Sequence, residues 1–186
     1  MASLLGLRDY DEKDVIGFYS FSGTHPCNKG TIVKVIGSGY VVDQDPSDML
    51  GSVGASYNNT VSQRYGVHYR VGPAGTGDNA LGMTLFDVKE TDENGEQLKF
   101  NPRKAYEIEA VISGQNVPVV TRGRFLYSGI TGAITPGQNL YVGAAGTIES
   151  VLASAQGVGG APAATVLGKA LGAKSAKGYV LVQLDF

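Results

Sequence analysis

The residues of this sequence that could hold a transition metal are its two histidines and its one cysteine. His25 and Cys27 are separated by one residue, and His68 lies much further along the chain. Imidazole and thiolate groups are ligands that zinc prefers, so these three side chains could form a zinc site if folding brought them together. Nothing in their spacing requires this, and a lone cysteine usually behaves as a small buried apolar residue. We therefore expect no metal and a buried Cys27.

Other patterns that could support chemistry are incomplete. Gly168 and Lys169 resemble the end of a phosphate-binding loop, but Ala170 stands where that loop needs Ser or Thr. The stretch 37–39 is not a five-residue nucleophile elbow, and two histidines leave few candidate bases. None of the acidic runs matches the twelve-residue calcium loop with its terminal Glu; these runs are 9–14, 43–48 and 92–96. The sequence therefore predicts no catalytic residue, no cofactor and no enzyme.

The composition favours a single all-β domain that is rich in turns. The chain has 186 residues, of which 42% are hydrophobic and 17% are charged, the latter below the typical value of about 25%. Its 27 glycines are about twice the usual share of roughly 7%, and they separate short β-type runs without a collagen-like period. A chain of this length can bury a substantial core.

Charge is distributed unevenly along the chain. Residues 1–93 hold 7 Lys and Arg against 12 Asp and Glu, a net charge of −5, whereas residues 94–186 hold 8 and 5, a net charge of +3. Neither half is charged strongly enough to indicate nucleic-acid binding. The split would allow a head-to-tail electrostatic match between copies, and an ordinary solvated surface is the alternative.

Three further features bear on cellular location. One cysteine cannot form an intrachain disulfide, which fits a protein made in a reducing cytoplasm. No segment approaches the roughly 18 apolar residues of a membrane span. Residues 1–7 are short and lack a basic start, so we expect no signal peptide and no membrane partner.

The stretch 116–127 is the clearest strand signal and the one around which we expect the domain to form. Val117, Val119 and Thr121 alternate with their neighbours as strand residues do, and Gly123 separates a second extended piece. Pro118 has no N–H to donate, so the strand should begin near it or lie at an edge. Further strands are expected at 15–21, 31–36, 40–42, 66–71, 81–88, 105–112, 139–142, 146–149 and 179–184.

Turns and one insert separate these expected strands. Asn94-Gly95 is the best short hairpin signal in the chain. Asp45-Pro46 opens residues 43–59 like a helix N-terminus, which makes this loop-rich insert the one candidate for a helix. Residues 153–164 are small and glycine-rich and are expected to form a surface loop.

Residues 1–14 are predicted to form an N-terminal arm on a domain that spans 15–186. Three leucines precede a charged run in this arm. They are expected either to dock on a neighbouring subunit by strand addition or to cover the protein's own core, and an unimportant terminus is the third alternative. The candidate contact residues are Leu4, Leu5, Leu7, Arg8, Asp9 and Tyr10.

Three pieces of the second half together resemble a known family. They are Gly114-Gln-Asn-Val-Pro-Val-Val-Thr-Arg-Gly123, Ile134-Thr-Pro-Gly-Gln-Asn-Leu-Tyr-Val142, and Gly168-Lys-Ala-Leu171 with Gly178-Tyr-Val-Leu-Val-Gln-Leu184. In this order they resemble the small head-decoration, or cement, proteins of lambda-type tailed phages. The likeness covers roughly residues 80–186, and residues 1–79 match nothing in that family.

The resemblance implies a small β barrel, of a β-tulip-like kind, with a structural function. Its members bind the outside of the assembled capsid, stabilise it and commonly form homotrimers there. The implied partners are the major capsid protein of a tailed phage and other copies of this chain, and the implied location is the exterior of the virion. A fibre-like adhesion or carbohydrate-binding module, using some of the ten tyrosines, is the alternative function.

Overall fold

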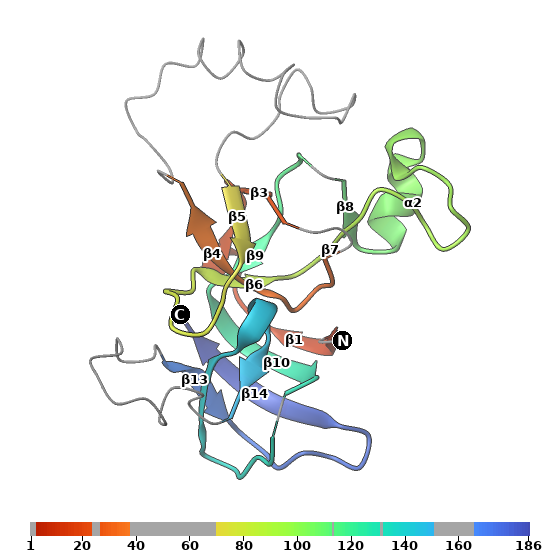
Figure 1. The fold of residues 1–186 in the computed structure, drawn as a ribbon. Coiled ribbons are helices and arrows are strands. Elements are labelled where there is room, and N and C mark those ends of the chain that lie inside the picture. The colour runs from red at the N-terminus through yellow and green to blue at the C-terminus, as the bar shows by residue number, and fades with distance from the viewer. Residues whose placement is uncertain (1–2, 24–26, 38–69, 113, 131, 151–165) are drawn as a thin grey trace.

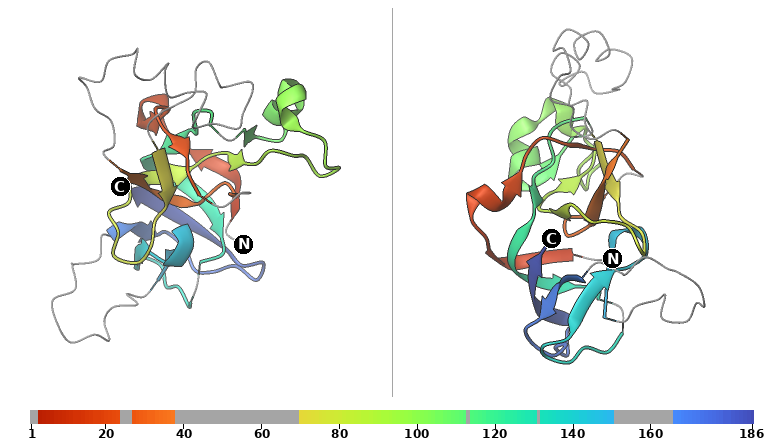
Figure 2. Two further views of the ribbon diagram at one scale, coloured as in Figure 1. Left: turned by 45° about the horizontal axis from the view of Figure 1, so that its top comes forward. Right: turned by 90° about the vertical axis from the view of Figure 1, so that its left-hand side faces the viewer.

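A computed structural model describes residues 3–23, 27–37, 70–112, 114–130, 132–150 and 166–186. The fold consists mainly of β-strands, which confirms the expected all-β class. Two six-stranded sheets lie one above the other, and a small lobe that contains helix α2 projects from the upper one (Figures 1 and 2).

The first sheet, sheet A, is formed by the N-terminal strand and the second half of the chain. All of its strands pair antiparallel. In spatial order they are β1 (Ser3–Asp9), β10 (Arg122–Ser128), β14 (Tyr179–Asp185), β13 (Val166–Ala170), β11 (Asn139–Val142) and β12 (Ile148–Glu149). A 3₁₀ turn, η3 (Ala144–Gly146), joins β11 to β12.

The second sheet, sheet B, is formed by the first half of the chain and one strand from the second half. Its order is β2 (Val15–Ile16), β9 (Val119–Val120), β6 (Gly82–Thr84), β4 (Ile32–Ile36), β5 (Arg70–Pro73) and β3 (Ser20–Phe21). Only β3 and β5 run parallel in this sheet. Both sheets end in open edges, so the described strands do not close into the expected barrel. Closure would require the edge strands of one sheet to pair, and β1 and β12 do not.

Two neighbouring segments of the chain cross together from one sheet to the other. The expected stretch 116–127 contributes β9 to sheet B and then, after Thr121, β10 to sheet A. Next to it, β1 lies in sheet A and β2 in sheet B, joined by the 3₁₀ turn η1 (Glu12–Asp14). The backbone N–H and the hydroxyl of Thr121 both donate to the carbonyl of Asp14, at 2.8 and 3.0 Å. This double contact holds the two crossing segments together.

The main core fills the space between the two sheets. Alternate residues of β14 point into it, as their spacing predicts: Val180, Val182 and Leu184 are buried. Tyr127 of β10 is fully buried there, and its hydroxyl donates to the carbonyl of Gly30 at 3.0 Å. A buried hydroxyl with a partner avoids the cost of desolvation without a hydrogen bond. A second core lies against sheet B and includes Cys27, which is buried as expected.

The projecting lobe corrects one strand prediction. Residues 105–112 were expected to form a continuous strand, but helix α2 (Pro102–Glu107) occupies the first part and β8 (Ala110–Val111) only the end. Proline is favourable in the first helical turn, and Arg103 and Glu107 pair one turn apart at 3.0 Å. The short 3₁₀ turn η2 (Leu98–Phe100) packs on α2, and β8 pairs in parallel with β7 (Asp87–Val88).

The remaining expected elements have mixed outcomes. The Asn94-Gly95 turn is present, since Gly95 has a φ of 84° and an isolated bridge joins Thr91 to Gln97. The expected strand 81–88 is divided into β6 and β7. The expected strand at 40–42, the insert at 43–59 and the loop at 153–164 lie outside the described residues.

Gly168 in β13 should be required for the packing of sheet A. Its φ is 154°, and a Cβ at this position would clash with the backbone carbonyl of Gln183 in the neighbouring strand. We expect Gly168→Ala to lower the free energy of unfolding by about 1–3 kcal/mol, measured by urea denaturation. Gly172→Ala is the matched control, because a Cβ there would contact nothing within 4 Å. Equal stability of the two variants would contradict this role.

Candidate interaction site at the N-terminal strand

Leu4, the first candidate contact residue, belongs to the protein's own core. It is 2% exposed and packs in the cluster that contains Tyr127 and Phe125. Gly30 borders the same space, because a Cβ on it would lie 3.0 Å from the ring of Tyr127 and 3.2 Å from the backbone nitrogen of Leu4. For Leu4 the structure therefore corresponds to the alternative in which the leucines cover the protein's own core.

Leu5 and Leu7 lie on an irregular part of the same strand. Leu4 pairs with Tyr127 and Arg8 pairs with Phe125, so the three residues between them oppose a single residue of β10. This is a bulge, which typically bends an edge strand and turns its side chains. Leu7 is 53% exposed and Leu5 is half-buried. Leu7 is thus the leucine that the structure leaves available to a neighbour.

Arg8 connects the N-terminal strand to the lobe. Its Nη2 donates to Oε2 of Glu109 at 2.6 Å, and Nζ of Lys29 donates to the same oxygen at 2.7 Å. Glu109 follows α2 and has a φ of 51°, a left-handed conformation that is uncommon for a non-glycine residue. The guanidinium of Arg8 is the main cause that lowers the pKa of Glu109, with Lys29 contributing in the same direction.

Asp9 and Tyr10 are exposed at the end of β1. The carboxylate of Asp9 lies 3.5 Å from Nη1 of Arg124 on β10, and both side chains are more than half exposed. The ring of Tyr10 stacks on that of Phe125, with centroids 6.0 Å apart and planes inclined by 25°. The ring contact holds Tyr10 at the end of β1. The exposed ion pair between Asp9 and Arg124 contributes little stability.

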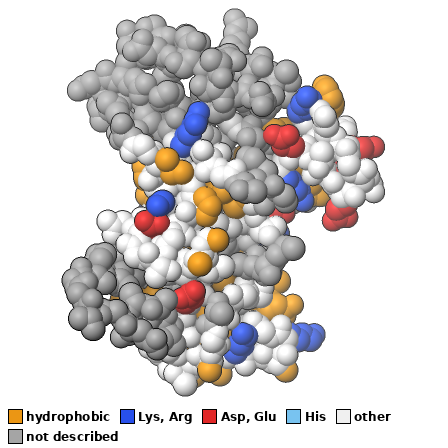
Figure 3. Space-filling model, in the orientation of Figure 1, with side chains coloured by type: hydrophobic (Ala, Val, Ile, Leu, Met, Phe, Trp, Pro, Cys, Tyr) orange, Lys and Arg blue, Asp and Glu red, His pale blue; other side chains and the backbone are white. Residues whose placement is uncertain are grey.

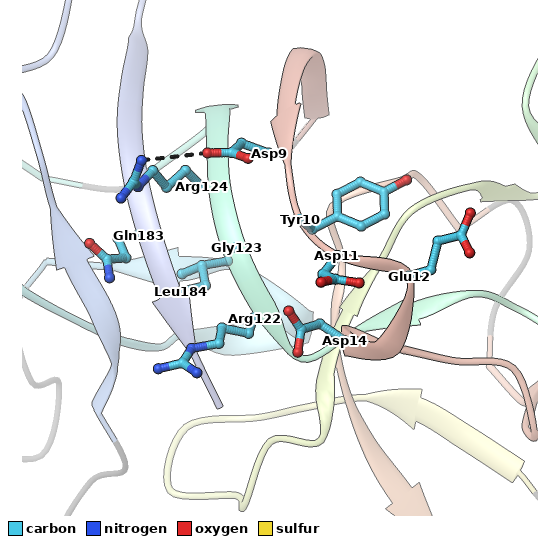
Figure 4. A pocket seen from close by; sticks show the side chains of 10 residues that line it. All are labelled: Asp9, Tyr10, Asp11, Glu12, Asp14, Arg122, Gly123, Arg124, Gln183 and Leu184. Carbon is cyan, nitrogen blue, oxygen red and sulfur yellow. Dashed lines mark hydrogen bonds and ion pairs between the residues drawn. The ribbon is translucent and has the colours of Figure 1, made fainter.

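An open pocket of about 630 Å³ lies where the chain crosses between the sheets. The side chains of Arg122, Arg124 and Gln183 lie on one side of it, and the acidic segment 9–14 lies on the other (Figure 4). The acidic side contains Asp9, Asp11, Glu12 and Asp14. The pocket thus brings together carboxylates and guanidinium groups from segments that are far apart in the sequence.

One ion pair lies within the acidic segment beside this pocket, between Lys13 and Asp11. A hydrogen bond from Lys13 lowers the pKa of Asp11, and the same contact raises the pKa of Lys13. Among the described residues, none forms an ion pair with the carboxylate of Glu12. A surface with both carboxylates and guanidinium groups is suited to electrostatic binding of a charged partner.

Among the described residues, no group of three or more His, Cys, Asp or Glu side chains is placed to hold a metal ion. His25 and His68 lie outside the described residues, so the zinc site considered from the sequence stays untested. Burial raises the pKa of the Cys27 thiol, which disfavours the thiolate that binds metals or attacks substrates.

No family model, curated protein or solved structure matches this chain. In the described part of the chain, no helix has the length and apolar character of a membrane span. On the face shown in Figure 3, hydrophobic side chains gather at the waist between the two sheets and charged ones surround them.

The sequence predicted residues 1–14 as an arm and did not predict that β1 pairs with β10 within the same chain. Glu109 lies in the stretch 105–112 that was expected to be a strand, and no local pattern indicates its left-handed conformation or its contact with Arg8. Arg124 and Gln183 stand in strands that were predicted correctly, so their outward positions could have been read from the alternation. Their closeness to the acidic segment could not, because it depends on the pairing of β1 with β10.

We expect Leu4 and Leu7 to differ strongly in their effect on stability. Leu4→Ala removes a fully buried side chain and should lower the free energy of unfolding by about 2–5 kcal/mol. Leu7→Ala changes an exposed side chain and should have an effect within about 0.5 kcal/mol. Chemical denaturation of both variants tests this, and a stable Leu4→Ala variant would show that β1 is not part of the core.

The ion pairs of Glu109 predict a pH dependence of stability. Its folded-state pKa is lowered, so the carboxylate stabilises the fold above its unfolded pKa, near 4.5, and this contribution is lost as the pH falls through the folded pKa. Glu109→Gln should therefore be less stable than the wild type at pH 7, by about 1 kcal/mol for a half-exposed site. The difference should shrink below about pH 4.5.

Glu93→Gln is the matched control for this prediction, because Glu93 is exposed and forms no ion pair with a described residue. The free energy of unfolding of both variants and the wild type is measured by denaturation at several pH values from about 3 to about 7, a range that includes the usual carboxyl pKa. A difference between Glu109→Gln and the wild type that stays constant over this span would contradict the assignment.

Proposed function

We propose that this chain is a virion structural protein that binds the outside of an assembled tailed-phage capsid and stabilises it. The observation that carries the proposal is the position of the residues that resemble head-decoration proteins. These pieces contain all of β11, most of β13 and β14 and the start of β10, which are four consecutive neighbours in sheet A, together with β9 of sheet B. Segments that are separate in the sequence thus lie side by side, mainly in one sheet, as a shared domain would require.

The stabilising effect would follow from linkage. A protein that binds only the assembled, expanded shell lowers the free energy of that state and of no other. The partners in this proposal are the major capsid protein and, in a homotrimer, other copies of this chain. The protein would be made in the host cytoplasm and would function on the exterior of the virion.

Leu7 supports a specific contact with the shell. It is exposed at 53% on the bulge of β1, and β1 is an edge strand of sheet A. An edge strand has unpaired backbone groups to which an extended segment of a capsid subunit can add. Leu7 would then be buried by that segment, with Arg8 held in place by Glu109 behind it.

A second candidate function is adhesion to carbohydrate. Phe100 and Tyr106 are 73% and 77% exposed on the projecting lobe, and the ammonium group of Lys99 lies 5.0 Å from the ring centroid of Phe100. Exposed aromatic rings can stack on sugars, but here they lie on a helical lobe rather than on a sheet face. Binding to a glycan array that is abolished by Tyr106→Ala would favour this candidate.

Purified protein should bind expanded shells assembled without it, and those shells should then resist heat and chelators better. Leu7→Asp should weaken shell binding by about ten- to a hundredfold, because a buried leucine contributes roughly 1.5–3 kcal/mol. Cosedimentation with shells measures both effects.

Ile36→Asp is the matched control for Leu7→Asp, since Ile36 is 39% exposed on β4 of the other sheet. Its shell affinity should equal that of the wild type. Failure of the wild-type protein to bind expanded shells would refute the proposed function, whereas unchanged binding by Leu7→Asp would refute only the role of β1.

A further inference from the structure

The outer face of sheet A carries two ordered rows of side chains. Directly paired residues of antiparallel strands point to the same side of a sheet. A polar row crosses four strands, because Gln183 pairs with both Arg124 and Lys169, and Lys169 pairs with Asn139. All four of these residues lie on the side away from the core, and three of them are exposed.

An aliphatic row lies directly beside the polar row. Leu126 pairs with Leu181, and the backbone N–H of Leu171 donates to the carbonyl of Leu181 at 2.8 Å. The first two leucines are half-buried and Leu171 is 42% exposed. Three adjacent leucines on an outward sheet face form an apolar stripe, which is more typical of an interface than of a solvated surface.

The outer face of sheet A is cationic, and the edge beside it is acidic. The cationic side chains of Arg122, Arg124 and Lys169 are exposed, and the segment 9–14 at the neighbouring edge contains four carboxylates and one lysine. The pocket lies between this acidic segment and the side chains of Arg122 and Arg124 (Figure 4). Only long contacts join them within one copy, such as the 3.5 Å pair between Arg124 and Asp9. The surface is therefore complementary in charge to itself.

We propose that copies of this chain bind one another through the outer face of sheet A. The acidic segment 9–14 of one copy would lie against the cationic side chains of the next, which are Arg122, Arg124 and Lys169. A second copy is the occupant that this surface fits, because it supplies both the carboxylates and the apolar stripe. Such a contact joins two different patches, and contacts of that kind form a ring when the rotation between copies closes and an open filament when it does not. The inference identifies the surface for the self-association included in the proposed function, but it does not require shell binding.

The two rows would have different roles in this contact. Exposed ion pairs contribute little affinity and mainly determine orientation and the rate of encounter. The leucine row excludes water and supplies most of the affinity. Self-association should therefore weaken with added salt only moderately, and it should weaken strongly when a charge is placed in the leucine row.

Charge-reversal variants test the proposal by sedimentation equilibrium. Arg124→Glu with Lys169→Glu should weaken self-association at least tenfold, and so should Asp11→Lys with Glu12→Lys. The variant that combines all four substitutions should regain association, because both patches have then exchanged their charges. Leu181→Glu should weaken association as well, and circular dichroism and thermal melts verify that each variant is folded.

The matched control is Lys99→Glu with Arg103→Glu, which reverses two cations on the lobe instead. It should associate like the wild type. A wild-type chain that stays monomeric at its highest soluble concentration, or a combined variant that fails to recover, would overturn the proposal. If the sheet A variants lose shell binding but keep self-association, the face binds the capsid instead, and the proposed function stands while this inference falls.

Discussion

The structure depends on one joint between its two sheets, where the ring of Tyr127 lies against Gly30. The Tyr127 hydroxyl donates to the Gly30 carbonyl at 3.0 Å, and the Gly30 N–H donates to the carbonyl of Thr84 at 2.7 Å. Gly30 has a φ of 91°, and any side chain on it would press on Tyr127 and Leu4. Sheet A, sheet B and the N-terminal strand therefore meet at one residue that only glycine occupies without strain. Burial raises the pKa of Tyr127, so its hydroxyl stays protonated and available as a donor.

The crossing of two chain segments explains both the fold and the pocket. β1 and β2 pair with β10 and β9, so residues 3–16 and 119–128 form a ribbon that belongs to both sheets. A ribbon that changes sheets has to bend, and here η1 takes up the bend on one side and Thr121 on the other. The bend opens the ladder between Asp9 and Asp14, and the charged pocket lies in that opening. The charges are exposed there because the ladder is interrupted.

The alternation of residues in the sequence predicted much of sheet A. The sequence did not predict which distant strands pair with one another. The pattern at 179–184 assigned inward and outward residues correctly, and β9 begins directly after Pro118, as the missing N–H requires. The strand expected at 105–112 was wrong because Ile108, Ala110 and Ile112 mimic a two-residue period after a helix that Pro102 begins. The described strands do not close into the expected barrel, because closure depends on which edges meet and local patterns carry no such information.

The position of Leu4 limits how the N-terminal strand could engage a neighbour. Releasing β1 would expose Leu4, break its ladder with β10 and leave Glu109 with Lys29 as its only described cation. Exposing one buried leucine alone costs about 1.5–3 kcal/mol, before the lost hydrogen bonds are considered. The binding free energy is therefore more favourable when a partner pairs with β1 in its place in sheet A than when the partner displaces β1 from the sheet. The inner side of this strand serves the fold, and its free edge with Leu7 is the part left for binding.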